Sequence, residues 1–182
     1  MATGLAVQAR LACLELLRED PQRLAHSAGV AAVVRRTAES LALPECDVLV
    51  AAAWLHDTGY SRSLVRRGLH GLDGAVRAQE AGLPRLAVSL IAHHSCAVVE
   101  ARLAGLHEAM LRFPPPPQDL MDVLDHADAT VSRGGSLRAA ALRLREAVHR
   151  HQDDRVRYEA LLLAVPARRA AVARVERRLA AT

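Results

Sequence analysis

Seven histidine and aspartate residues of this sequence have side chains that could bind a metal ion. They are His26, His56, Asp57, His70, His93, His94 and Asp128. Neutral imidazole nitrogens together with carboxylate oxygens suit a first-row divalent cation such as Mn²⁺, Fe²⁺, Co²⁺, Ni²⁺ or Zn²⁺. Because a carboxylate has two oxygens, Asp57, which directly follows His56, can also bridge two ions about 3.5–4 Å apart.

The apolar segment before His56 predicts that these groups lie inside the protein. The longest fully apolar run, Val48 to Leu55, belongs to an expected helix over 45–56 that is apolar over most of its surface and therefore buried on most sides. A carboxylate at the end of such a helix costs free energy unless a cation or several donors compensate it. The remaining histidines and Asp128 each lie near the apolar face of their own expected helix. Helices that share one core would bring them together.

The elements that must position these residues are all helical in pattern, since no segment shows the alternation typical of a strand. The expected helices cover residues 3–19, 22–41, 45–56, 70–82, 84–94, 97–112, 118–131, 136–150 and 154–181, the last divided at Pro166. The connections between them are short, apart from a loop over 58–68. The sequence therefore predicts an all-α, single-domain helical bundle over residues 1–182 with a metal site between its helices.

The composition favours a globular protein and argues against nucleic-acid binding. Apolar residues make up 51% and charged residues 24%, in a chain of 182 residues that suits one domain. All 24 basic residues are arginine, and the absence of Lys and Asn indicates a GC-rich coding sequence rather than a nucleic-acid patch. An aromatic content of 2% excludes an aromatic stacking platform for single strands. The C-terminal arginines are interpreted as a solvated helix face: Arg168, Arg169, Arg174, Arg177 and Arg178.

Cysteine usage and the lack of targeting signals favour a cytoplasmic protein. Cys13, Cys46 and Cys96 are odd in number and lack the spacing of a metal site, so free thiols are expected. The N-terminal segment lacks a basic signal-peptide region, and the longest apolar run is too short to span a membrane. We expect no membrane partner. The C-terminal helices would cover the core or form an oligomer contact, which leaves a monomer and a homodimer both open.

The order His26, His56-Asp57 and Asp128 resembles the HD superfamily of metal-dependent phosphohydrolases over about residues 20–132, with residues 133–182 forming C-terminal helices. The resemblance implies an all-helical bundle whose metal lies between the helices. It also implies that one ion is held by His26, His56, Asp57 and Asp128. Asp122 and Asp125 compete for the last position on the same helix, and the resemblance favours Asp128.

The additional histidines are similar to those of the two-metal branch of this superfamily. In that case Asp57 would bridge, and the second ion would be held by His70 and by the His93-His94 pair. Adjacent helical residues point about 100° apart, so His93 is slightly preferred and His94 is kept as a ligand or as a donor to the substrate. His107, His126, His149 and His151 are interpreted as surface or supporting residues.

The resemblance implies hydrolysis of a phosphate ester or anhydride of a small, nucleotide-like substrate, by water that one or two ions activate. Many members continue the HD pair with a small residue, Gly and Lys, whereas this chain has Thr58-Gly59-Tyr60. Guanidinium groups from the following loop are expected to bind the phosphate instead: Arg62, Arg66 and Arg67. Asp73 lies one helical turn after His70 and is expected to act in catalysis beside Asp57, by orienting a ligand imidazole or relaying a proton.

Two other functions remain open at the level of sequence. The same histidine-rich pattern permits an HD-like mixed-valence diiron oxygenase, which iron-dependent oxygen consumption with an organic substrate would reveal. A non-catalytic nucleotide-binding HD protein would keep the fold and lack turnover.

Overall fold

A computed structural model describes residues 4–182, and helices account for nearly all of its regular structure. The elements are α1 (Leu5–Leu16), α2 (Pro21–Ser40), α3 (Cys46–Leu55), η1 (Thr58–Tyr60), α4 (His70–Glu80), α5 (Arg85–His93), η2 (His94–Cys96), α6 (Ala97–Leu103), α7 (His107–Met110), α8 (Gln118–Thr130), α9 (Ala140–Arg150) and α10 (Arg155–Ala180). Within the described part of the chain the only strand-like pairing is an isolated bridge between Val131 and Leu137. The expected all-α fold is confirmed, while the expected helix start at residue 3 lies outside the described residues.

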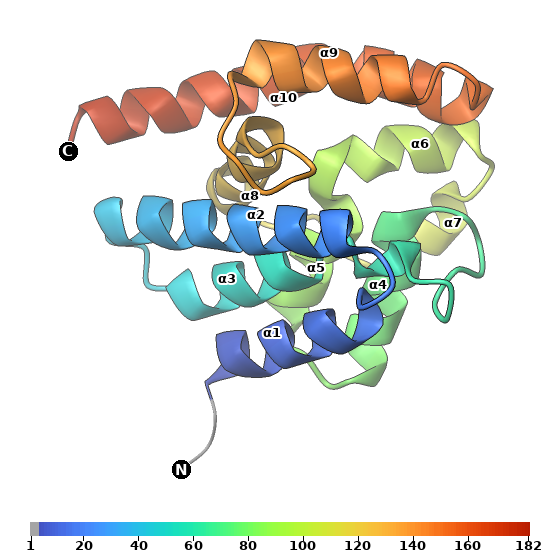
Figure 1. Ribbon diagram of the computed structural model, residues 1–182, viewed down its shortest axis with the longest axis horizontal. Helices are drawn as coiled ribbons and strands as arrows, with labels where there is room; N and C mark the ends of the chain where they lie inside the picture. Colours follow the sequence, from blue (N-terminus) through green and yellow to red (C-terminus); the bar gives the residue numbers. More distant parts are fainter. Residues whose placement is uncertain (1–3) are drawn as a thin grey trace.

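The helices surround a central apolar core on which the site depends. α3 packs against both α1 and α2, and α5 packs against α3 and α4. On the opposite side of the molecule from α1, helices α9 and α10 lie beside each other and cover the side formed by α6 and α8 (Figure 1). The C-terminal helices therefore form the outer layer over the region where α2 and α8 meet.

α3 lies at the centre of the bundle because its side chains are small and apolar. Ala51, Ala52 and Ala53 are fully buried, and together they let neighbouring helices approach closely. α2 begins at Pro21 after Asp20, whose carboxylate accepts the backbone N–H of Arg23 as a helix cap. The apolar faces of these two helices place the end of α3 and the first turns of α2 in the interior.

Two expected helix boundaries are wrong, and turns explain both. The helix expected over 97–112 is two helices, separated by a turn in which Gly105 has a φ of +71° that glycine adopts without strain. The helix expected over 136–150 begins only at Ala140, because the residues before it form a loop that pairs with Val131.

The break expected at Pro166 is also wrong, since α10 runs through it. A proline inside a helix removes one hydrogen bond to the carbonyl four residues earlier. That carbonyl belongs to Leu162, on a side of α10 where the side chains of Leu162 and Leu163 are exposed. Ala164 and Arg168 on either side are buried and keep the helix packed against its neighbours.

Arg85–Leu103 is the one stretch in the described residues that is long and apolar enough to cross a membrane by length and composition. It is not one straight helix, because Ser95 and Cys96 have φ values of 56° and 58° and divide it into α5 and α6. Half of its most apolar window is buried inside the protein, as in a core segment of a helical domain. All three cysteines are free.

Candidate metal centre

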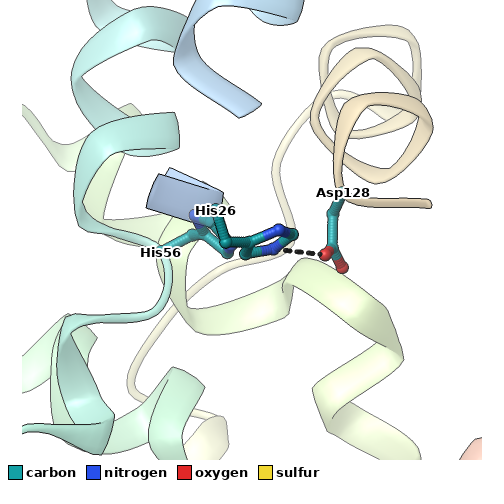
Figure 2. A group of neighbouring side chains, drawn as sticks. All are labelled: His26, His56 and Asp128. Atoms are coloured by element: carbon teal, nitrogen blue, oxygen red, sulfur yellow. Dashed lines mark hydrogen bonds and ion pairs between the residues drawn. The ribbon is translucent and has the colours of Figure 1, made fainter. Parts of the chain in front are cut away.

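A cluster of imidazoles and carboxylates is buried where α2, α3, α4, η2 and α8 meet. Its members are His26, His56, Asp57, His70, His94 and Asp128, each less than 9% exposed. Figure 2 shows His26, His56 and Asp128 directed toward one another from α2, the end of α3 and α8. Two overlapping groups have ligand atoms that all lie within 4.8 Å of one another, and either could hold a metal ion. The groups are His26, His56 and Asp128, and His56, Asp57 and His94.

Asp57 lies at the centre of the cluster, with both carboxylate oxygens facing imidazole nitrogens. Its Oδ1 is 3.7 Å from Nε2 of His56, 3.7 Å from Nε2 of His70 and 3.9 Å from Nε2 of His94. Its Oδ2 is 4.0 Å from Nε2 of His26. One oxygen therefore faces the histidines of α4 and η2 and the other faces α2, which is the arrangement that a bridging carboxylate needs.

Backbone carbonyls fix the orientation of three of the four imidazoles. Nδ1 of His56 and Nδ1 of His94 each lie 2.7 Å from a carbonyl oxygen, and Nδ1 of His26 lies 3.1 Å from one. The acceptors are the carbonyl groups of Ala53, Ile91 and Ser132. Because a carbonyl only accepts, Nδ1 carries the proton and Nε2 keeps its lone pair for the cluster. Histidine ligands of metals are held in this way.

Within the described residues, 4–182, the cluster contains buried ring nitrogens without a hydrogen-bond partner, Nε2 of His56 and Nδ1 of His70. Burial lowers the pKa of His56 to about 4 despite the neighbouring carboxylates, so the ring is neutral at neutral pH. Next to it, Nε2 of His70 lies 3.0 Å from Nε2 of His94, and burial followed by the charge of His94 lowers the pKa of His70 well below its usual value. Unsatisfied lone pairs in the interior are costly, and a divalent cation would satisfy them, so the donor set fits a metal.

The two carboxylates are ionised in spite of their burial. Burial raises the pKa of Asp128, but Arg168 and His26 outweigh it and hold this pKa well below its ordinary value. Nη2 of Arg168 donates to Oδ2 of Asp128 at 2.5 Å, and the Ser95 hydroxyl donates to the same oxygen at 2.6 Å. For Asp57, burial is likewise outweighed by the surrounding imidazoles, His56 first among them, and by the Arg23 guanidinium. The site thus combines neutral nitrogen ligands with two negative charges.

Comparison with known families is consistent with this geometry. The HD domain family matches residues 23–133, which is more than half of the chain and contains all six residues of the cluster. The chain belongs to the HD domain family. This superfamily consists mostly of metal-dependent hydrolases, and its domains bind divalent metals. Comparison with curated proteins and with solved structures gives no match. Helices α9 and α10 lie beyond the matched segment.

The preference for His93 over His94 is wrong in this HD domain. Nε2 of His93 lies 2.9 Å from the carbonyl oxygen of Phe113, outside the cluster. The backbone between the two histidines is close to helical, with ψ of −8° at His93 and φ of −57° at His94, so their side chains diverge as adjacent helical residues do. The packing of α5 directs His94, and not His93, at Asp57.

Asp73 does not contact the ligand histidines. Its carboxylate accepts backbone N–H groups from three consecutive residues of the loop before α4: Arg66, Arg67 and Gly68. Its role in this structure is to hold that loop, because donors from the backbone already occupy its oxygens. The competing aspartates of α8 are also engaged elsewhere, since Asp122 pairs with Arg174 of α10 and Asp125 accepts the backbone N–H of Ser95.

The loop arginines expected to bind phosphate lie away from the cluster. Arg62, Arg66 and Arg67 are exposed, and none of them lines the cavity over the histidines. Arg62 instead lines a separate cavity of about 720 Å³ at the end of α1, together with several acidic residues. The arginines that do line the cavity over the metal centre, which has a volume of about 90 Å³, are Arg23, Arg133, Arg143, Arg150, Arg157 and Arg168.

Arg23 and Tyr60 are two site residues that the sequence analysis missed. Nη1 of Arg23 donates to Oδ2 of Asp57 at 2.9 Å, and its guanidinium lies 3.5 Å from the centroid of the Tyr60 ring. Tyr60 in turn stacks on His70 with ring centroids 4.2 Å apart. One signal was present, because Arg23 precedes His26 by three residues and so shares its helix face.

Arg168 is a third site residue that the sequence analysis missed. Its interpretation as part of a solvated helix face is wrong. It is 4% exposed and pairs with Asp128. Its signal in the sequence is an arginine at a position of the apolar face of α10, in series with Ala160, Ala164 and Val172. Arg174 also departs from that interpretation through its pairing with Asp122.

Proposed function

We propose that this HD domain is a metal-dependent phosphohydrolase that cleaves a phosphate ester or anhydride of a small, nucleotide-like substrate. The observation that carries the proposal is the buried cluster itself, in which neutral imidazole lone pairs and two ionised carboxylates converge and Nε2 of His56 has no partner. The arginine-lined cavity beside it supports a phosphate-bearing substrate, because guanidinium groups bind phosphate oxygens through paired N–H donors.

The cluster has donors for one or two ions. His26, His56, Asp57 and Asp128 would hold one ion, and the shared Asp57 with His70 and His94 would hold a second. A bound divalent cation lowers the pKa of a coordinated water and offsets negative charge on phosphate oxygens. The metals that suit these donors are Mn, Fe, Co, Ni and Zn in their divalent forms.

Side chains of the protein position the reacting groups around this centre. Arg23 is fixed by Asp57 and by the Tyr60 ring, so its remaining N–H groups are held at the cavity wall, where they would bind a phosphate oxygen. Arg157 is held by Glu100 at 3.1 Å and lies 5.4 Å from the same ring. Rigid donors of this kind orient an anion without losing much side-chain entropy on binding.

The test combines metal analysis with a search for turnover. Elemental analysis of the purified protein should find a transition metal, and a screen of phosphorylated metabolites with added Mn²⁺ or Fe²⁺ should show phosphate release. An oxygen electrode in the same assays separates the alternatives. Release without oxygen uptake supports the hydrolase, whereas iron-dependent oxygen uptake with an organic substrate supports the diiron oxygenase.

Asp57→Ala is the decisive variant because it removes the carboxylate that the two proposed ion sites would share. It should lose bound metal and all turnover while keeping its helical circular dichroism, since Asp57 lies in the turn between α3 and η1 and not within a helix. Asp47→Ala, an exposed aspartate at the other end of α3, is the matched control and should keep both. Full activity in Asp57→Ala would show that the reaction occurs elsewhere.

A further inference from the structure

Half of the arginines around the cavity are without a carboxylate partner. Arg23, Arg157 and Arg168 form ion pairs with Asp57, Glu100 and Asp128. The others line the same cavity and form no ion pair with any residue of the described chain, 4–182. They are Arg133, Arg143 and Arg150. Their charges are therefore available for a ligand.

Among these three arginines, Arg143 gives the strongest indication of an anion site because it is buried. The residue is 8% exposed, and its Nε donates to the carbonyl oxygen of Val131 at 2.8 Å. Its Nη1 is buried and has no hydrogen-bond partner among residues 4–182. A buried cation with an unused donor is costly on its own, so this side chain is arranged for an anion that enters the cavity.

α9 directs a whole face toward the cavity. Arg143, Ala147 and Arg150 all line it, at the i, i+4 and i+7 positions that share one side of a helix. Arg133 approaches from the loop after α8. These three side chains line the same cavity, and burial followed by the charges of Arg143 and Arg133 lowers the pKa of Arg150.

The charge around the cavity exceeds what a single phosphate would need. Its lining contains six arginines and three carboxylates, an excess of three positive charges before any metal ion is bound. A phosphate ester carries about −1.5 to −2 at neutral pH. One phosphate beside a divalent cation in the His/Asp cluster would leave the guanidinium groups on the opposite wall uncompensated.

We propose that Arg133, Arg143 and Arg150 form a binding site for a second phosphate group, so that the substrate is a diphosphate or polyphosphate compound rather than a monophosphate. The inference rests on the proposed function, because it takes the reacting phosphate to lie at the His/Asp cluster. Arg143 and Arg150 lie beyond the segment that matches the HD domain, so the C-terminal helices supply this selectivity. A cavity of about 90 Å³ is well below the roughly 300 Å³ of the smallest drug-sized pockets, so the phosphates enter it and the organic part stays outside.

The test compares two non-hydrolysable probes on the metal-loaded, full-length protein. Methylphosphonate has one anionic group, and methylenediphosphonate has two. Isothermal titration should show that the wild-type protein binds methylenediphosphonate at least tenfold more tightly. Arg150→Gln and Arg133→Gln should each reduce this preference by about tenfold, the lower end of what a lost charged hydrogen bond costs. Arg145→Gln, on the same helix but exposed and outside the cavity lining, should retain it.

Two results would overturn the second phosphate site. One is equal affinity of the wild-type protein for the two probes, and the other is an unchanged preference in the Arg133→Gln/Arg150→Gln double variant. Metal content measured after each titration shows that the diphosphonate has not simply removed the ion. Because neither probe turns over, a diphosphonate preference without phosphate release in the metabolite screen would refute the hydrolase and keep the anion site. Phosphate release without that preference would refute the anion site alone.

Discussion

The buried pair of Arg168 and Asp128 leads to a specific prediction about how metal and stability are linked. The two side chains are 5% and 9% exposed, and their nearest atoms are 2.5 Å apart. Apart from Arg168, the polar contacts of Asp128 within residues 4–182 are the Ser95 hydroxyl, which donates to Oδ2, and Nε2 of His26, which lies 3.1 Å from Oδ1. In the absence of metal, Arg168 is therefore the main positive charge that compensates this carboxylate.

Arg168→Met keeps a long apolar side chain and removes the charge. Breaking a buried ion pair by removing one partner costs about 3–5 kcal/mol, because the other charge is left uncompensated. For a chain of this size each kcal/mol corresponds to about 2–4 °C in Tm, so we expect the metal-free variant to unfold roughly 6–20 °C below wild type. A bound divalent cation supplies the missing positive charge. Metal should consequently raise the Tm of Arg168→Met more than it raises that of the wild-type protein.

Thermal and urea unfolding in chelator and in Mn²⁺ measure both effects. Arg169→Met is the matched control, since Arg169 is the exposed neighbour on the same helix and should change stability by less than about 0.5 kcal/mol. Adding Asp128→Asn to Arg168→Met should restore part of the lost stability in chelator, because no unpaired charge then remains. The reasoning is refuted if Arg168→Met and Arg169→Met are equally stable in chelator, or if metal stabilises them equally.

Three further predictions follow from the site and the helices around it. His94→Ala should lose at least one bound ion in elemental analysis, whereas His93→Ala should keep its full metal content, and the opposite result would contradict the position of the two rings. The metal-free protein should lose stability as the pH falls from 6.5 to 4. Burial lowers the pKa of His56 to about 4 in the folded chain, so only the unfolded chain takes up a proton there in this pH range. Urea unfolding should show a loss of about 3 kcal/mol from this residue, and a His56→Gln variant whose free energy of unfolding falls equally steeply with pH would disprove the contribution of His56. Gly59→Ala should unfold at much lower urea concentration than Gly134→Ala, because a Cβ at Gly59 would collide with the backbone at the start of α4, while one at Gly134 would make an ordinary contact of 3.9 Å with the Ser132 hydroxyl. Equal midpoints would show that Gly59 and the start of α4 are not in close contact.

The fold class followed from local properties of the sequence, whereas the four residues expected to hold a first ion came from the resemblance to the HD superfamily. Periodicity predicts helices because it records which face of a segment is apolar, and the fully apolar run before His56 predicts a buried helix wherever the chain places it. Periodicity did not predict a helix boundary correctly where the effect of a single residue depends on the packing around it. Pro166 does not end α10, because Ala164 and Arg168 on either side of it are buried against neighbouring helices.

Only the tertiary structure could decide which of two adjacent side chains enters the site and which distant charges meet there. His93 and His94 are equivalent as sequence neighbours, and the packing of α5 directs His94 at Asp57 and His93 at the carbonyl group of Phe113. Arg168 is forty residues from Asp128, and only the packing of α10 on α8 brings them together. The sequence by itself determined the chemical types of the groups and their local helical register, since both are properties of a short segment. Which charged groups pair with one another depended on how segments far apart in the chain pack, because the attraction between two charges depends on their distance in space.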